Sequence, residues 1–345
     1  MKQLKRWIGS RNTSEADRKA DREAARLTAE SFRHYDSDST LTLSTPQVIR
    51  AGKTGGLPFD TLTTDLFGGC LPGREVCYGN CFAARAAYAA GIDFGARVPN
   101  ILDRDVLCGD LERLPASQKF LRNGWNSDPS WNWRNAARLS QWIRESGRLT
   151  IFNTKNFTRL QPDTVRSLAA AKAELWVCVS AFDSDAQIEH RIDTIETFRE
   201  AGGCAVPLVM TTRFIEPELN AKQEQLVQYM TAHDLPAAEN SLRFAPTSPV
   251  MDILDRMRMR QIASSGHFWS GRLYAGVLRV PTTSSLPPGY SGLQSGYLSR
   301  NDSDFLESLF ADPVHTHEEV LASPPLEKPV QAGVPLVHVS HRATA

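Results

Sequence analysis

The stretch from Gly68 to Phe82, GGCLPGREVCYGNCF, brings three cysteines together on one short loop. Cys70, Cys77 and Cys81 follow the spacing C-x6-C-x3-C, between a strand-like stretch and an alanine-rich helical stretch. Three thiolates on one loop match three ligands of a four-iron cluster, which leaves the fourth iron open to a small molecule. A closed structural metal site normally has four protein ligands. The loop therefore predicts an open metal centre.

Two alternatives remain for the same three cysteines. With a histidine or a water molecule as the fourth ligand, three thiolates also hold zinc. Zinc loops usually place about two to four residues between the first two cysteines, whereas this loop has six. The second alternative is that these thiols bind no metal.

Composition and charge are those of a soluble globular protein. The 345 residues include 39 basic and 39 acidic side chains, so no net charge attracts nucleic acid or an anionic membrane. No apolar run approaches the roughly 20 residues of a membrane span, and no apolar core follows Met1–Trp7 as it does in a secretory signal. Three of the six cysteines are scattered, which is not a disulfide framework. We therefore expect a cytoplasmic protein.

Strand-like stretches alternate with helical stretches through the middle of the chain. The predicted strands are residues 57–67, 119–124, 148–153, 174–180, 206–211, 242–245 and 273–280. The predicted helices are residues 81–90, 133–145, 162–172, 186–201 and 220–233. Such alternation is typical of a parallel sheet with crossover helices, and roughly six units fit before residue 260. The predicted fold class is α/β, a partial (β/α)6 TIM-like barrel.

The two ends of the chain differ from this middle part. Residues 1–45 are rich in charged side chains and predict a helical N-terminal arm. Residues 46–280 form the predicted barrel that carries the cysteine loop. Residues 281–345 are rich in Pro, Ser and Gly and predict an irregular, partly disordered C-terminal extension.

The cysteine loop and the strand–helix alternation together resemble the radical S-adenosylmethionine superfamily. Its members have a partial (β/α)6 barrel with three cysteines after the first strand, commonly spaced C-x3-C-x2-C with an aromatic residue before the last. In this chain Asn80 precedes Cys81, and Tyr78 and Phe82 lie close by. The resemblance covers residues 57–260, and the cysteine loop is its one specific motif.

The resemblance implies a [4Fe-4S] cluster on Cys70, Cys77 and Cys81. The open iron of such a cluster binds S-adenosylmethionine, and reductive cleavage of this cofactor starts radical chemistry on a substrate. The implied partners are an electron donor such as flavodoxin or ferredoxin and a small-molecule or peptide substrate. The altered spacing leaves open which bond of S-adenosylmethionine is cleaved.

Further cofactor contacts are implied beside the cysteines, after the second strand and at the end of the fourth strand. The residues in these places are Tyr78, Asn80, Phe82, Asn123, Gly124, Ser127, Asp128 and Ser180. For Asn123, Ser127 and Asp128 the residues themselves equally favour a polar turn in which Ser-Asp-Pro caps the next helix.

Other polar and aromatic residues have simpler interpretations. Lys155 follows the third strand and is expected in solvent, with pairing to a carboxylate or phosphate as the alternative. Cys178 shares a strand face with Ser180 and is expected to pack as a small apolar residue. Trp133 and Trp142 have the spacing of core contacts on a helix. Without a basic patch, nucleic acid is an unlikely partner.

The leading hypothesis is a cytoplasmic enzyme that resembles the radical S-adenosylmethionine superfamily. The alternative is a non-catalytic binding protein, possibly for nucleic acid, stapled by zinc or by an iron–sulfur cluster. Binding of S-adenosylmethionine distinguishes the first hypothesis from the second, and the presence of iron and sulfide excludes the zinc-stapled form of the second.

Overall fold

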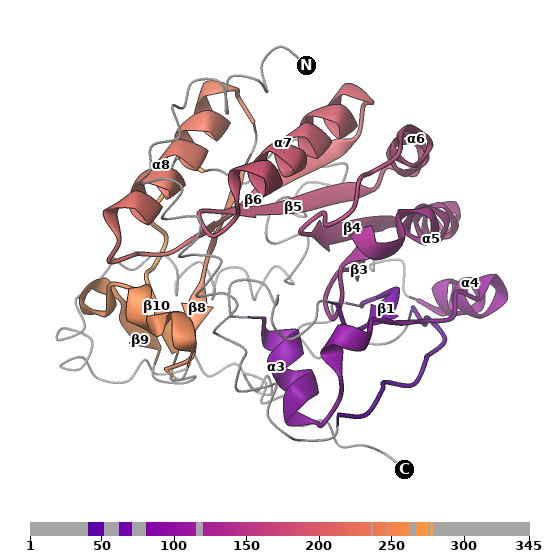
Figure 1. Cartoon of the computed structure of the whole chain (residues 1–345). Coiled ribbons are helices and arrows are strands. Elements are labelled where there is room, and N and C mark those ends of the chain that lie inside the picture. The colour runs from indigo at the N-terminus through magenta and orange to yellow at the C-terminus, as the bar shows by residue number, and fades with distance from the viewer. Residues whose placement is uncertain are drawn as a thin grey trace, which may run out of the picture.

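The computed structural model describes residues 41–51, 62–70, 81–114, 120–235, 237–246, 248–262, 267–274 and 277–278. Its centre is a curled half-barrel sheet of five parallel strands in chain order (Figure 1). These strands are β3 (Phe120–Asn123), β4 (Leu149–Thr154), β5 (Glu174–Ser180), β6 (Cys204–Thr211) and β7 (Ala238–Ser241). The α/β class is confirmed, with a parallel half-barrel at its core.

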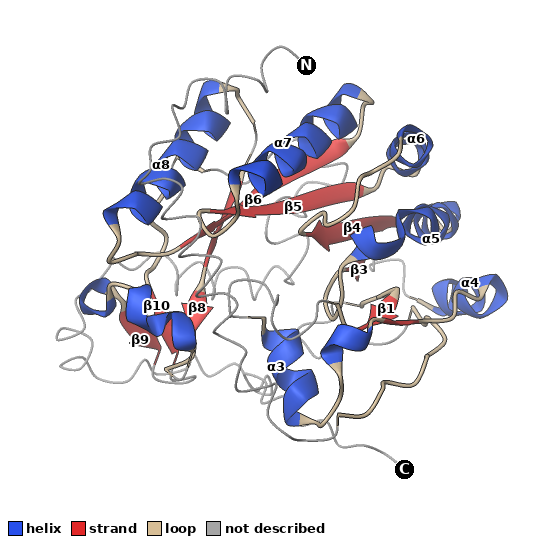
Figure 2. Ribbon diagram, viewed as in Figure 1, coloured by secondary structure: helices blue, strands red, loops and turns tan. Residues whose placement is uncertain are grey.

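Helices connect successive strands and cover the outer face of this sheet (Figure 2). Their bounds are α4 (Arg104–Arg113), α5 (Trp133–Glu145), α6 (Pro162–Ala170), α7 (Asp185–Glu200) and α8 (Pro217–Ala232). Proline at the first turn starts α6 and α8, where a missing N–H costs no hydrogen bond. A capping box of Ser184 and Gln187 starts α7. None of the helices in the described ranges is long and apolar enough to span a membrane.

Both faces of the central strand β5 are packed, which explains its nearly continuous apolar sequence. Leu175 and Val177 belong to the main core under the helices. Trp176 faces the inner side of the half-barrel, where it packs in a second cluster, and Cys178 packs against that cluster. The parallel register pairs Trp176 with Val206 of β6. Cys178 thus packs against apolar neighbours, as expected.

A short segment adds a sixth parallel neighbour beside β3. Thr63 forms a parallel bridge with Arg122, and the amide of Thr64 donates to the carbonyl of Arg122 at 2.8 Å. Two residues after this segment, β1 (Phe67–Gly68) pairs antiparallel with β2 (Val98–Pro99). The strand expected over residues 57–67 is therefore broken into two short pieces, and residues 52–61 lie outside the described part.

A separate antiparallel sheet lies beyond the C-terminal ends of β6 and β7 (Figure 1). It consists of β8 (Arg243–Phe244), β9 (Arg260–Ile262) and β10 (His267–Trp269), with β10 in the middle. Phe244 and Phe268 pack there with Phe182 and Phe214, which follow β5 and β6. The small sheet thereby closes one side of the half-barrel.

The prediction of a strand over residues 273–280 is wrong for the residues that the structure describes. The amides of Val277 and Leu278 donate to the carbonyl of Tyr274, which makes a turn. Leu273 and Tyr274 instead donate their amides to the carboxylate of Glu239 on β7.

The ends of the chain lie largely outside the described residues. Of the predicted N-terminal arm, residues 41–45 are described, and Thr42 forms a parallel bridge with Ile92. The predicted C-terminal extension, residues 281–345, is outside the described part.

Candidate metal and cofactor site

Cys70 lies just after β1, buried at 8% exposure. Its amide donates to the carbonyl of Phe94 at 2.8 Å. The preceding Gly69 has φ +93°, and a Cβ there would come within 2.2 Å of the Phe94 carbonyl oxygen. Only glycine permits this close approach, so Gly69 holds the first cysteine against the following chain.

Cys81 is the N-cap of α3 (Phe82–Ala89), where its Sγ accepts a hydrogen bond from the amide of Ala84 at 3.5 Å. Burial raises the pKa of the Cys81 thiol, while the amides of Ala83 and Ala84 act in the opposite direction. Amides at a helix start favour a thiolate, which is the form that binds metal.

The first and third cysteines of the loop share one packed cluster. Cys70, Ala83, Ala84 and Phe94 form its centre, and Cys81 packs against them. The structure therefore brings together two of the three predicted metal ligands.

The remaining predictions for the loop fall on residues that the structure does not describe. Cys77, Tyr78 and Asn80 lie outside the described ranges, and the side chain of Phe82 is not described. Among the described residues no three His, Cys, Asp or Glu side chains form a metal-binding group. Since the predicted group includes Cys77, iron binding stays a prediction.

An aromatic residue on a distant segment contacts the first cysteine. The indole N–H of Trp131 donates to the Sγ of Cys70 at 3.1 Å. Its ring stacks on Phe157, with centroids 4.9 Å apart and planes 11° apart. The guanidinium of Arg97 lies 4.4 Å from the Trp131 ring centroid. Sequence analysis did not identify this contact, because Cys70 and Trp131 lie 61 positions apart and no local pattern connects them.

The loop after β3, residues 124–128 and hereafter the β3 loop, is anchored by a carboxylate from the neighbouring segment. Asp65 accepts the amides of Gly124 at 2.7 Å, Trp125 at 2.9 Å and Asn126 at 2.7 Å. Burial raises the pKa of Asp65, and these three amides oppose that shift. Sequence reasoning missed Asp65, since a single aspartate carries no motif.

Gly124 is required where the β3 loop crosses β4. It has φ +91°, and a Cβ there would lie 2.0 Å from the carbonyl oxygen of Asn153. The preceding Asn123 is fully buried and donates its side-chain amide to the carbonyl of Thr64 at 2.5 Å. Gly124 was predicted only as a cofactor contact. The structure shows that it also allows the backbone of the β3 loop to pass close to the carbonyl of Asn153.

Two predicted cofactor-binding residues have buried oxygen atoms with no hydrogen-bond partner within the described part of the chain. They are the side-chain carbonyl oxygen of Asn123 and the hydroxyl oxygen of Ser127. Buried polar atoms are nearly always hydrogen-bonded in proteins. These two oxygens are therefore candidate acceptors for a polar ligand at the end of β3.

Asp128 joins the β3 loop to the end of β4. One carboxylate oxygen accepts from the hydroxyl of Thr154 at 2.6 Å and the amide of Ser130 at 2.9 Å. The other accepts the amide of Lys155 at 2.6 Å. Asp128 is the N-cap of the 3-10 helix η5 (Pro129–Asn132), which is the capping role anticipated as the alternative. Burial raises the pKa of this carboxyl group.

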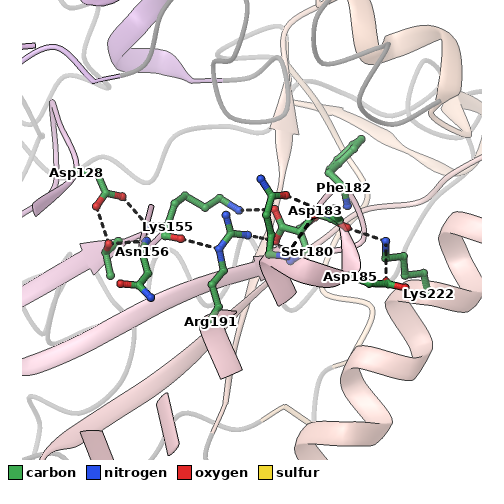
Figure 3. A network of polar contacts seen from close by, with 12 residues as sticks. Asp128, Lys155, Asn156, Ser180, Phe182, Asp183, Asp185, Arg191 and Lys222 are labelled. Atoms are coloured by element: carbon green, nitrogen blue, oxygen red, sulfur yellow. Dashed lines mark hydrogen bonds and ion pairs between the residues drawn. The ribbon is translucent and has the colours of Figure 1, made fainter. Parts of the chain in front are cut away.

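A buried ion network follows, formed by Lys155, Asp183, Arg191, Lys222 and Asp185 (Figure 3). Lys155 is 6% exposed and lies 3.4 Å from Asp183, so the expectation of a solvated lysine is wrong. Arg191 forms an ion pair with Asp183 and donates to the Lys155 carbonyl at 2.6 Å. Lys222 donates to the Asp183 carbonyl at 2.7 Å.

Ser180 connects to the same network at the end of β5. Its amide donates to the Asp183 carboxylate at 2.8 Å, and its hydroxyl accepts the amide of Phe182 at 3.2 Å. Burial opposes ionisation of Asp183, but Arg191 and Lys155 outweigh it and lower the pKa of this carboxyl group. A chain of contacts thus runs from Asp128 to Ser180 across the strand ends (Figure 3).

No protein-family model matches the chain, and no curated protein matches its sequence. The chemistry of the site is therefore inferred from its own residues. Two cysteines, two buried oxygens and the ends of three parallel strands lie on the side of the sheet where such folds form their sites.

Proposed function

We propose that this chain is a radical S-adenosylmethionine-like enzyme with a partial (β/α)6 barrel. In this proposal Cys70, Cys77 and Cys81 hold a [4Fe-4S] cluster. The observation that carries it is the packing of Cys70 and Cys81 in one cluster, which follows the first parallel segment and β1. In barrels of parallel strands, functional sites form at the C-terminal ends of the strands, which supports a cofactor site here.

The donor atoms fit this group. Thiolate sulfur is the usual ligand of iron–sulfur clusters, and hydrogen bonds to the sulfurs stabilise the bound state. Cys70 and Cys81 each accept such a hydrogen bond, from Trp131 and Ala84. The buried oxygens of Asn123 and Ser127 are acceptors for the ammonium group of a bound amino acid.

When bound, the cluster and S-adenosylmethionine supply one-electron cleavage of a carbon–sulfur bond in the sulfonium group. The residues of the chain itself orient the cofactor and shield it from water. Asp65 holds the β3 loop by three amides, and Asp128 ties that loop to β4. Tyr78, Asn80, Phe82 and Ser180 complete the proposed cofactor contacts. We place the enzyme in the cytoplasm with a flavodoxin or ferredoxin as electron donor, because the thiols need a reducing compartment.

Anaerobic reconstitution and electron paramagnetic resonance (EPR) test this proposal. The reduced protein is expected to show a four-iron signal that changes when S-adenosylmethionine is added. The Cys70, Cys77 and Cys81 to Ala triple variant is expected to lose the signal, and Cys108→Ala, which removes a thiol from α4, is expected to keep it. Stoichiometric zinc without iron or sulfide would overturn the proposal and favour the zinc-stapled binding protein.

A further inference from the structure

We infer that Trp131 raises the reduction potential of the cluster through its hydrogen bond to Cys70. This inference rests on the proposed function, because it concerns the cluster that Cys70 would help to hold. Trp131 acts through another residue, so it is a positioning and tuning residue and not a catalytic one. No local pattern in the sequence connects it to the cysteine loop.

The contact has the geometry of a hydrogen bond to sulfur. The indole nitrogen of Trp131 lies 3.1 Å from the Sγ of Cys70, and both side chains belong to the same packed cluster. A donor to an anionic acceptor makes a stronger bond than a donor to a neutral one. A reduced cluster carries one more negative charge, so a donor to its sulfur stabilises the reduced state more and raises the potential.

The surrounding residues hold the indole in place. Phe157 stacks on one side of Trp131, and the Arg97 guanidinium lies 4.4 Å from the ring centroid. The Phe157 amide donates to the hydroxyl of Ser130 at 3.0 Å, which ties the stacking partner to η5. Asp128 caps η5 and bonds to the end of β4. A donor held this firmly needs no reorganisation when the cluster gains an electron.

Arg97 acts in the same direction as the indole. Its positive charge lies on the ring that contacts Cys70, and a cation near a cluster favours the more negative, reduced state. The left-handed backbone of Arg97, at φ 51°, is a conformation that non-glycine residues adopt rarely. It occurs directly before β2, the strand that pairs with β1 next to the cysteines.

The test compares Trp131→Phe with a matched control, Trp133→Phe, in the full-length reconstituted protein. Trp133 also donates its indole N–H at 3.1 Å, but to the carbonyl of Thr158. A potentiometric titration read by the EPR signal of the reduced cluster gives the midpoint potential. We expect a more negative midpoint for Trp131→Phe and an unchanged midpoint for Trp133→Phe.

A second measurement uses the wild-type chain, in case Trp131→Phe takes up no cluster. Protein grown with indole-15N tryptophan is expected to show a 15N coupling to the reduced cluster in pulsed EPR. Where Trp131→Phe does load, its loss of this coupling assigns the signal.

The possible outcomes distinguish the role of Trp131 from the proposed function. Suppose that the wild-type protein shows the cluster signal. If the midpoint potential is then unchanged in Trp131→Phe, or if the wild-type signal has no 15N coupling, the role of Trp131 is overturned and the proposed function stands. Absence of any iron–sulfur cluster from the wild-type protein overturns the proposed function, and the role of Trp131 falls with it.

Discussion

The cysteine cluster and the buried ion network lie on the same side of the sheet but differ in what they leave open. Around Cys70 and the β3 loop, the side-chain oxygens of Asn123 and Ser127 lack partners among the described residues. In the ion network, Asp183 accepts from Arg191, Lys155 and Ser180. We therefore interpret the network as scaffold and the cysteine cluster with the β3 loop as the site.

The largest expected effect is on the scaffold. Asp183→Ala removes the carboxylate that Arg191 and Lys155 share in the interior, and breaking a buried ion pair typically costs about 3–5 kcal/mol. Urea unfolding at neutral pH is expected to show this loss in the free energy of unfolding. Asp163→Ala, which breaks an exposed ion pair with Arg166 at the start of α6, is the control and is expected to cost less than about 1 kcal/mol. Equal losses in the two variants would contradict the role of Asp183 as part of a buried scaffold.

The contribution of the Asp183 carboxylate to stability is also expected to depend on pH. The pKa of Asp183 is lower in the folded chain than the ordinary value, so its stabilisation is present above about pH 4 and is lost as pH falls through the folded pKa. The stability difference between wild type and Asp183→Asn is expected to stay constant from pH 7 to pH 5. By pH 3 this difference is expected to be smaller, because Asp183 takes up protons more readily in the unfolded chain. A difference that grows on acidification would show the opposite sign of the pKa shift.

Asp65 connects scaffold and site, so its loss is expected to affect both. Asp65→Ala removes the acceptor of three amides, and leaving such groups unsatisfied costs about 1–3 kcal/mol. A looser β3 loop is also expected to weaken binding of S-adenosylmethionine, measured as the concentration that changes the EPR signal. Asp65→Asn keeps one acceptor oxygen and is expected to fall between wild type and Asp65→Ala. Unchanged binding in a destabilised Asp65→Ala would limit Asp65 to a structural role.

The smallest effect separates binding from stability. Ser127→Ala removes a hydroxyl with no partner in the described part of the chain, so the free energy of unfolding is expected to change by less than about 0.5 kcal/mol. Loss of one hydrogen bond to the cofactor is expected to weaken its binding about two- to tenfold. Ser140 on α5 has a similar buried hydroxyl away from the strand ends, so Ser140→Ala is the matched control. Equal binding in both variants would remove Ser127 from the site.

The fold was predictable where the periodicity was strong. The helix over 133–145 and the strand over 174–180 match the structure residue for residue, and the half-barrel follows from their alternation. The strand β7 was missed because Ala238–Ser241 is short, with no β-branched residue, and is defined by its register with β6. The helix α4 was missed as well, although Asp103 caps it.

Local sequence patterns were enough to predict the strand–helix alternation from β3 to α8, the cysteine loop between the first strand and helix, and the polar β3 loop. Local spacing carries these features, because apolar periodicity and capping act over a few residues. Three contacts are visible only in the folded chain: Asp65 holds the β3 loop, Lys155 is buried against Asp183, and Trp131 contacts Cys70. Each of these contacts joins residues 28 to 61 positions apart, which come together because they follow parallel segments that pair side by side.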